Sequence, residues 1–255
     1  MDILDRFLEN AEKSIAEGYY DVGKAEGIKR VSLRKKLGER FTVITEIKHA
    51  SPSGDYEYRE IDPEKTAMDF LASGSDAISA VVEPKLFRGK LSNIPRAKKA
   101  GLPVLFKDFV ISHKQIDAAA NVGADVVLLV VKALSRMEID LDSMVGKAHE
   151  AGLEVLLESY DEDEMRLAME SDADILGINN RDLQTLKVDI GRTKRILEKT
   201  GTCDKPVISE SGIKSADDVR FVRKLGVSGV LVGTAIWKAE NLRDKVRELR
   251  SGADE

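Results

Sequence analysis

A stretch near the middle of the chain, GLPVLFKDFVISHKQIDAAANVGADVVLLVV at residues 101–131, decides the fold. It begins with a short apolar run, continues through an amphipathic segment, and ends in a second run rich in β-branched residues. Ile116, Ala119 and Ala120 have helical spacing, and Gly123 is a helix stop signal. Two short buried strands joined by a helix are typical of a parallel sheet. The stretch therefore predicts a βαβ unit.

The same alternation continues from residue 42 almost to the end of the chain. Eight short apolar runs are separated by longer amphipathic segments, which is the pattern of repeated βα units. The predicted strands cover residues 42–48, 76–82, 103–107, 125–131, 153–158, 174–178, 205–209 and 229–232. A chain of 255 residues fits the roughly 250 residues that a (β/α)8 TIM barrel needs. We therefore predict an α/β protein with this barrel fold.

A short repeated sequence pattern supports a closed barrel. Gly74-Ser75-Asp76 and Gly123-Ala124-Asp125 each precede a predicted strand, at a spacing of about fifty residues, or two βα units. An open doubly wound sheet is the structural alternative.

The first forty residues lie outside this rhythm. We expect one domain over residues 1–255, with residues 1–40 as an N-terminal helical extension. Its start has an apolar helical face, followed by a basic stretch at residues 32–36. The face comprises Ile3, Leu4, Phe7, Leu8, Ala11 and Ile15. Such a helix can plug an end of the barrel or cover the active site, and the pattern favours neither.

Composition restricts the partners of the protein. The formal net charge of -5 argues against a nucleic-acid partner, which requires a concentrated basic surface. No apolar run is long enough for a signal peptide or a membrane span. We expect no membrane partner and a monomeric protein.

Cysteine and histidine are sparse. Cys203 is the single cysteine, which excludes a disulfide framework and is typical of a reduced, cytoplasmic protein. The three histidines, His49, His113 and His149, lack metal-ligand spacing. Walker A and dinucleotide motifs are absent from the sequence. We therefore expect no metal and no cofactor.

Charged and polar side chains follow five of the predicted strands at the same end. They are Glu46 and Lys48, Lys107, Glu158, Asn179 and Arg181, and Glu210 and Ser211. The C-terminal ends of barrel strands converge on one face. Alternation along the first strand places Ile44, Glu46 and Lys48 on one side. Glu46 and Lys48 alone could be a structural ion pair, but acids and bases from five strands favour a site for an ionic ligand.

Small and glycine-rich segments form a second candidate group. Ser51 follows the first strand, Ser211-Gly212 the seventh, and Gly233-Thr234 the eighth. Loops after the last two strands of a barrel often bind phosphate through backbone N–H groups and a helix N-terminus. A glycine after a strand is often only a turn, so the pair Gly233-Thr234 alone is a weak signal. Together these segments predict a phosphate cradle.

At these positions the sequence resembles the indole-3-glycerol-phosphate synthase family. The stretch EIKHASPSG at residues 46–54 resembles the signature of that family. Further matching stretches are LFKDF at 105–109, LE at 157–158, GINNRDL at 177–183 and SESGI at 209–213. Glu83 and Phe87 resemble the loop after the second strand, and the likeness covers residues 41 to about 237. Departures are Val82 in place of threonine, His49 in place of arginine or lysine, and Ser159-Tyr160 in place of a β-branched residue and histidine.

The resemblance implies a reaction and a set of roles. The substrate would be 1-(2-carboxyphenylamino)-1-deoxyribulose 5-phosphate, an anion with a phosphate and a carboxylate, which is closed, decarboxylated and dehydrated to indole-3-glycerol phosphate. Lys107 would be the general acid, and Glu158 the principal base or acid of the dehydration. Glu46 would be a second carboxylate and Lys48 a further charge near the substrate. The substrate would be bound by Ser51, Phe87, Phe109, Asn179, Arg181, Glu210, Ser211, Gly212, Gly233 and Thr234.

Two further expectations concern segments near the site. We expect the polar segment 55–60, which contains Tyr56 and Tyr58, to be a mobile lid. Trp237 is expected to pack under a helix and not on the substrate.

Two other functions fit the same residues less well. A sugar-phosphate isomerase or epimerase usually has paired aspartates or a histidine-bound metal. A non-catalytic barrel that binds a phosphorylated metabolite would have little use for Lys107 together with Glu158. The function that the resemblance implies, a carboxy-lyase and thus a carbon–carbon lyase, is therefore favoured over these two alternatives.

Overall fold

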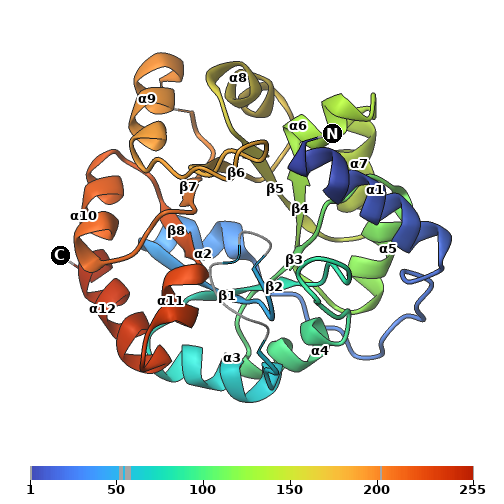
Figure 1. The fold of residues 1–255 in the computed structure, drawn as a ribbon, viewed down its shortest axis with the longest axis horizontal. Helices are drawn as coiled ribbons and strands as arrows, with labels where there is room; N and C mark the ends of the chain where they lie inside the picture. Colours follow the sequence, from blue (N-terminus) through green and yellow to red (C-terminus); the bar gives the residue numbers. More distant parts are fainter. Residues whose placement is uncertain (1, 52–53, 55–58, 202, 255) are drawn as a thin grey trace.

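The protein is a closed parallel β-barrel surrounded by helices (Figure 1). The computed structural model describes residues 2–51, 54, 59–201 and 203–254. The strands pair in chain order, and β8 pairs with β1, so the alternative of an open sheet is wrong. They are β1 Thr42–Ile47, β2 Ala77–Val81, β3 Val104–Lys107, β4 Val126–Val130, β5 Glu154–Ser159, β6 Ile175–Asn179, β7 Val207–Glu210 and β8 Gly229–Val232.

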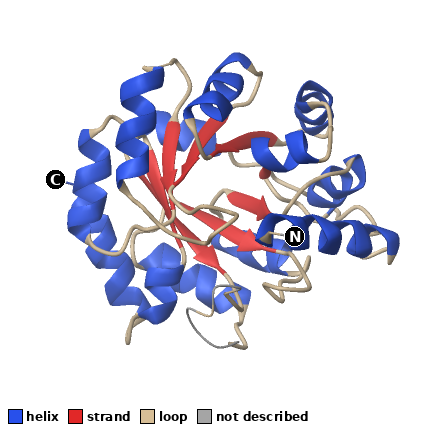
Figure 2. Ribbon diagram, turned by 45° about the horizontal axis from the view of Figure 1, so that its top comes forward, coloured by secondary structure: helices blue, strands red, loops and turns tan. Residues whose placement is uncertain are grey.

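Helices lie outside the strands all round the barrel (Figure 2). Those that follow β1 to β8 are α3 Pro63–Ala72, α4 Asn93–Ala97, the 3-10 helix η1 Lys98–Ala100, α5 His113–Asn121, α6 Val131–Arg136, α7 Leu141–Glu150, α8 Glu162–Glu170, α9 Gly191–Thr200, α10 Ala216–Lys224, α11 Thr234–Lys238 and α12 Leu242–Asp254. Asp62, Ser112, Asp140, Asp161 and Ser215 cap the first turns of α3, α5, α7, α8 and α10. Such a cap stabilises a helix by about 1 kcal/mol, and it fixes where the loop after a strand ends.

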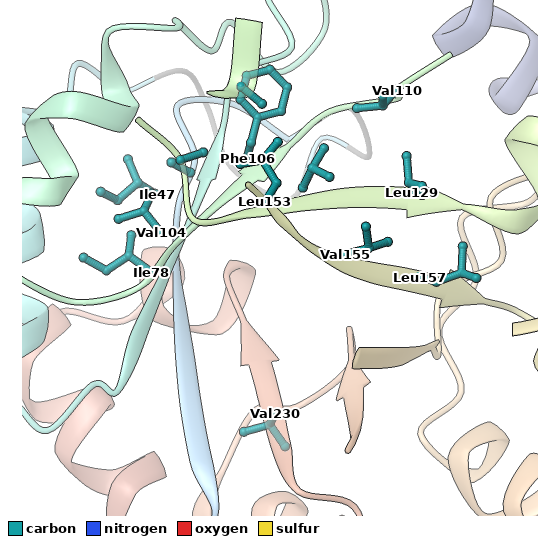
Figure 3. Packing of buried hydrophobic residues seen from close by; sticks show 14 of the residues in the cluster. Ile47, Ile78, Val104, Phe106, Val110, Leu129, Leu153, Val155, Leu157 and Val230 are labelled. Atoms are coloured by element: carbon teal, nitrogen blue, oxygen red, sulfur yellow. The ribbon is translucent and has the colours of Figure 1, made fainter. Parts of the chain in front are cut away.

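Alternation along the strands divides the core into two layers. Val104 and Phe106 of β3 belong to the outer layer, between barrel and helices, and so do Val155 and Leu157 of β5 (Figure 3). Inward-facing residues form a second cluster inside the barrel, which includes Ile44, Leu105, Leu128, Leu156 and Ile208. Full burial of one such side chain contributes about 1.5–3 kcal/mol.

The eighth strand has the predicted bounds, and the boundaries of the other strands differ from the predicted ones by at most two residues. The seventh strand begins at Val207 and not at 205, because Pro206 has no N–H to give to the ladder. Val131 was predicted to end the fourth strand but begins α6. A continuous apolar run cannot show where a strand becomes a helix.

The N-terminal extension meets both ends of the barrel. The predicted apolar face forms α1, Ile3–Ala16, which buries Leu4, Phe7 and Leu8. The basic stretch begins α2, Leu33–Glu39, whose first residue donates its N–H to Glu154 at the N-terminal end of β5 (2.8 Å). At the N-terminal end of the barrel, Leu33 and Leu37 of α2 pack against the inward-facing core, and α1 brings Phe7 to a cavity at the opposite end, where the strands terminate.

Candidate active site

Two lysines and two glutamates form a chain of ion pairs at the C-terminal end of the barrel. Lys107 Nζ lies 2.9 Å from Glu210 Oε2 and 3.4 Å from Glu46 Oε2. Glu46 Oε1 also lies 3.1 Å from Lys48 Nζ, which donates a hydrogen bond to Thr234 Oγ1 at 3.2 Å. The four charged side chains come from β1, β3 and β7 and from the residue after β1. Strands far apart in the sequence thus place alternating charges across the mouth of the barrel.

The charges in this chain stabilise one another. Burial by itself would lower the pKa of Lys107, but the carboxylates of Glu210 and Glu46 outweigh it and raise that pKa. Burial would likewise raise the pKa of Glu46, but the ammonium groups of Lys48 and Lys107 lower it. Lys107 is therefore an ammonium and Glu46 a carboxylate at neutral pH. A second lysine nearby would by itself lower the pKa of Lys107, but the carboxylates of Glu210 and Glu46 raise it.

Glu158 has the opposite electrostatic environment. It lies at the end of β5, is buried, and accepts a hydrogen bond from Asn179 Nδ2 at 2.8 Å. Burial, and then repulsion by Glu210, raise its pKa to about 8. Lys107 lowers this pKa less than those two effects raise it. Glu158 therefore holds a proton at neutral pH, while Glu46 does not.

Two glycines leave the space that the carboxylates occupy. A Cβ on Gly177 of β6 would overlap Glu210 Oε1, and a Cβ on Gly233 would overlap Glu46 Oε1. Glu210 Oε1 is buried and has no hydrogen-bond partner among the described residues. Gly177 therefore leaves room for Oε1, while Oε2 of the same carboxylate is held by Lys107.

Gly177→Ala is expected to lower turnover at least tenfold. The added methyl group would displace the Glu210 carboxylate from Lys107, and the ammonium group that donates the proton would lose one of its two carboxylate partners. Steady-state kinetics with a thermal unfolding scan measures this effect. Gly146→Ala is a matched control, since a Cβ there has no neighbour within 4 Å. Wild-type turnover in folded Gly177→Ala would contradict the role of this glycine.

A cavity of about 790 Å³, counting space open at its mouth, is lined by three of the four charged residues in the chain of ion pairs. Its polar residues include Glu46, Lys48, Lys107 and Glu158. One of its ends is aromatic: Phe7 stacks on Phe109 at 4.4 Å and on Phe87 at 5.7 Å between ring centroids. This end suits a flat apolar group.

Glu83 builds the loop that carries Phe87. Its carboxylate accepts hydrogen bonds from the backbone N–H groups of Lys85, Leu86 and Phe87 at 2.7–2.9 Å. One side chain thus fixes the turn after β2. Sequence reasoning noted Glu83 but gave it no role.

A second cavity of about 1220 Å³ adjoins the first and shares Glu46, Lys48, Lys107, Arg181 and Ser211 with it. Its other lining residues include Gly212, Lys214, Gly233, Thr234 and Lys238.

Backbone conformation shapes the cradle in the second cavity. Ser211 and Gly212 both have left-handed conformations, with φ of 65° and 83°. Buried Asn180 holds this turn, because its Nδ2 donates to the carbonyl oxygen of Ser211 at 3.0 Å. The combination of glycine-rich backbone with lysines fits a phosphate. Asn180 was not among the predicted site residues.

The structure brings the predicted site residues to one end of the barrel. Ten line the first cavity: Lys107, Glu158, Glu46, Lys48, Ser51, Phe87, Phe109, Asn179, Arg181 and Ser211. Gly212, Gly233 and Thr234 line the second, and Glu210 lies beneath them, bound to Lys107. Phe7, Asp108, Leu183 and Leu186 also line the first cavity but were not predicted.

The departures from the family pattern contact protein groups. Buried His49 has ring nitrogens 3.2 Å from Asn93 Nδ2 and from the carbonyl oxygen of Arg59. The guanidinium of Arg192 lies 3.6 Å from the centre of the Tyr160 ring. Neither His49 nor Tyr160 is among the described residues that line the two cavities.

Trp237 and the segment 55–60 were also singled out in the sequence. Trp237 is buried beside Phe70 of α3 and donates to the carbonyl oxygen of Glu46 at 2.7 Å, which confirms that it packs under a helix. In the expected lid at 55–60, residues 55–58 lie outside the described residues. No helix in the described part of the chain is long and apolar enough to span a membrane.

The fold and the site define a barrel enzyme that acts on a phosphorylated small molecule. A sequence model described as indole-3-glycerol phosphate synthase matches residues 18–249. A protein of that name from Methanocaldococcus jannaschii is 37% identical and covers 94% of this chain and 90% of its own length. One from Caldanaerobacter subterraneus is 38% identical, with 96% and 95% covered. The chain belongs to the indole-3-glycerol phosphate synthase family and serves tryptophan biosynthesis.

Solved structures support the fold. The 3-hexulose-6-phosphate synthase of Salmonella typhimurium is similar with a TM-score of 0.64 at 20% identity, and covers 84% of this chain and 98% of its own. Thiamine phosphate pyrophosphorylase from Pyrococcus furiosus gives 0.61 at 24% identity, with 88% and 98% covered. At these identities the likeness concerns the barrel alone. Family membership favours the synthase over the isomerase, the epimerase and the non-catalytic barrel.

Proposed function

We propose that this chain is a carboxy-lyase that converts 1-(2-carboxyphenylamino)-1-deoxyribulose 5-phosphate into indole-3-glycerol phosphate, carbon dioxide and water. The observation that carries the proposal is the position of Lys107. Its ammonium group lies between Glu46 and Glu210, where the aromatic cavity joins the glycine-rich cradle. A ketone placed between a bound aryl ring and a bound phosphate would therefore meet this ammonium.

The two cavities orient the substrate. The aryl ring stacks among Phe7, Phe87 and Phe109, and the phosphate binds at Ser211-Gly212 and Gly233-Thr234. Lys48 lines both cavities and offsets the negative charge of the phosphate. Holding both ends of a flexible chain brings the aryl carbon and the ketone together, which lowers the entropic part of the barrier.

Ring closure uses Lys107 as general acid. The aryl carbon that bears the carboxylate attacks the ketone carbon, the carbonyl π electrons move to oxygen, and Lys107 gives that oxygen a proton. Loss of carbon dioxide from the same aryl carbon returns the bonding electrons to the ring. Glu210 and Glu46 hold the ammonium for this task.

Dehydration uses Glu158. The proton that this side chain holds at neutral pH passes to the hydroxyl group, which leaves as water. Loss of a proton from the neighbouring carbon then completes the indole, and carboxylate Glu46 is the second group available for it. Asn179 holds Glu158 for this step.

The oligomeric state, the location and the partners of the protein are also proposed. We expect residues 1–255 to act as one monomeric domain in the cytoplasm, because one cysteine suits a reducing compartment. A net charge of -5 supports a small anionic substrate held by local lysines, and no nucleic-acid partner.

An ultraviolet assay with the purified protein tests this function. Incubation with the carboxyphenylamino substrate is expected to produce the absorbance of an indole together with one equivalent of carbon dioxide. Addition of inorganic phosphate is expected to inhibit competitively, because it binds the cradle in place of the substrate. Recovery of unchanged substrate, or of an isomerised sugar phosphate without an indole, would refute the proposal.

A further inference from the structure

The segment that follows α1 places two consecutive tyrosines against the barrel. Gly18 has a left-handed φ of 75°, and the N–H of Tyr19 returns to the carbonyl oxygen of Ser14 at 3.0 Å. This pattern ends α1 and turns the chain. Tyr20 is 4% exposed, and its ring meets that of Tyr19 edge to face at 5.0 Å. The two hydroxyl groups then contact two different loops.

Tyr19 holds both ends of the loop that carries Phe87. Its hydroxyl donates to the carbonyl oxygen of Val82 at 2.9 Å and accepts from the N–H of Leu91 at 3.1 Å. Glu83 fixes the interior of the same loop. The loop after β2 is therefore tied from inside by Glu83 and from outside by Tyr19.

Tyr20 holds the end of β3. Its hydroxyl donates to Asp108 Oδ2 at 2.7 Å, while Asp108 Oδ1 accepts the N–H of Phe109 at 2.8 Å. Asp108 is buried and lies between Lys107 and Phe109 in the sequence. Burial raises the pKa of Asp108 to about 7, and the hydrogen bond from Tyr20 lowers it. This hydrogen bond thus joins the N-terminal extension to the residue between the general acid and an aromatic wall.

We infer that Tyr19 and Tyr20 are positioning residues for the aryl ring of the substrate: their hydroxyl groups hold the loops after β2 and β3, so that Phe87 and Phe109 stack on Phe7. The inference rests on the proposed function, because it concerns the same substrate. Each tyrosine belongs to the N-terminal extension, which also supplies Phe7, so the extension both contributes to the aromatic wall of Phe7, Phe87 and Phe109 and holds its loops.

Tyr20→Phe tests the inference, since it removes one hydroxyl and leaves the ring. KM for the substrate is expected to rise about tenfold, as for loss of one buried hydrogen bond, while kcat changes less than about twofold. The matched control is Tyr160→Phe, which loses a hydroxyl bonded to Arg192 away from the aromatic loops. Its KM is expected to stay within about twofold of wild type.

A double-variant cycle separates positioning from general stability. In a Phe7→Ala background, Tyr20→Phe is expected to change KM less than about twofold, because the contact that it positions is already gone. Equal effects of Tyr20→Phe on KM with and without Phe7 would overturn the inference. So would a lower unfolding temperature with wild-type KM.

Two measurements distinguish the proposed function from the positioning role of the tyrosines. One is the indole assay, and the other is the calorimetric affinity for a substrate analogue whose ketone is reduced to an alcohol. If wild type makes no indole, the proposed function fails. If wild type makes indole but Tyr20→Phe binds this analogue as tightly as wild type, only the inference fails.

Discussion

Replacement of Lys107 by alanine is expected to lower kcat by about a thousandfold, because a positioned general acid contributes roughly 10²–10⁴ in rate. The variant should keep the barrel, since the lysine side chain reaches into the cavity and fills no core position. Its unfolding temperature should fall, because Glu46 and Glu210 lose the ammonium group between them. Stopped ultraviolet assays and far-ultraviolet circular dichroism measure the two effects.

Two controls make this expectation specific. Lys147→Ala removes an ammonium that lies 2.6 Å from Asp117, far from the cavity, and should leave kcat unchanged. Lys107→Arg keeps the positive charge but is a much weaker acid, so it should recover stability and not turnover. Turnover of Lys107→Ala within about tenfold of wild type would remove the general acid from the account.

Replacement of Glu158 by glutamine is expected to abolish most turnover and to raise stability above neutral pH. Glutamine keeps the hydrogen bond with Asn179 but has no proton to exchange. In wild type, kcat/KM should fall as pH rises through about 8, because Glu158 of the free enzyme then loses the proton that it gives to the leaving hydroxyl. This limb should be absent from the residual activity of the variant.

The stability effect follows from the direction of the pKa shift. Glu158 titrates near its ordinary 4.5 in the unfolded chain and near 8 in the folded protein. Between these values the folded state binds the extra proton, so its contribution to stability is complete below pH 4.5 and is lost as pH rises to 8. Stability of wild type should therefore fall as pH rises through this range, and the variant should lack this fall. Urea unfolding at pH 5 and pH 8 measures the difference, with Glu170→Gln as an exposed control. Parallel pH dependence in wild type and Glu158→Gln would contradict the raised pKa.

The sequence predicts the barrel because its signals are local. Alternation over residues 101–131 reports which faces of a strand or helix are buried, and Gly123 reports a left-handed helix end, with φ of 89°. The parallel arrangement then brings strand ends together, so Lys107, Glu158 and Glu210 could be assigned to one face without coordinates. Pairing of Lys107 with Glu210 could not be assigned, because it depends on how strands 103 residues apart are placed.

Residues missed by sequence reasoning act through distant contacts or through absent atoms. Phe7 has the same local pattern as Leu4 and Leu8, and only tertiary packing shows that it faces the cavity. Gly177 looks like an ordinary weak point in a strand, while its role is to leave space for Glu210. Asn180 occurs in the GINNRDL stretch, but its partner Ser211 lies in the turn after the next strand, β7. A periodic pattern carries none of this information.

The central claim is that one anionic molecule spans the aromatic wall, Lys107 and the glycine-rich cradle. A crystal structure with the substrate whose ketone is reduced to an alcohol tests this claim most directly. We expect its phosphate at Gly212 and Gly233, its aryl ring on Phe109, and its new hydroxyl within hydrogen-bond distance of Lys107 Nζ. The analogue bound with that hydroxyl remote from Lys107, or with its phosphate outside the cradle, would contradict it.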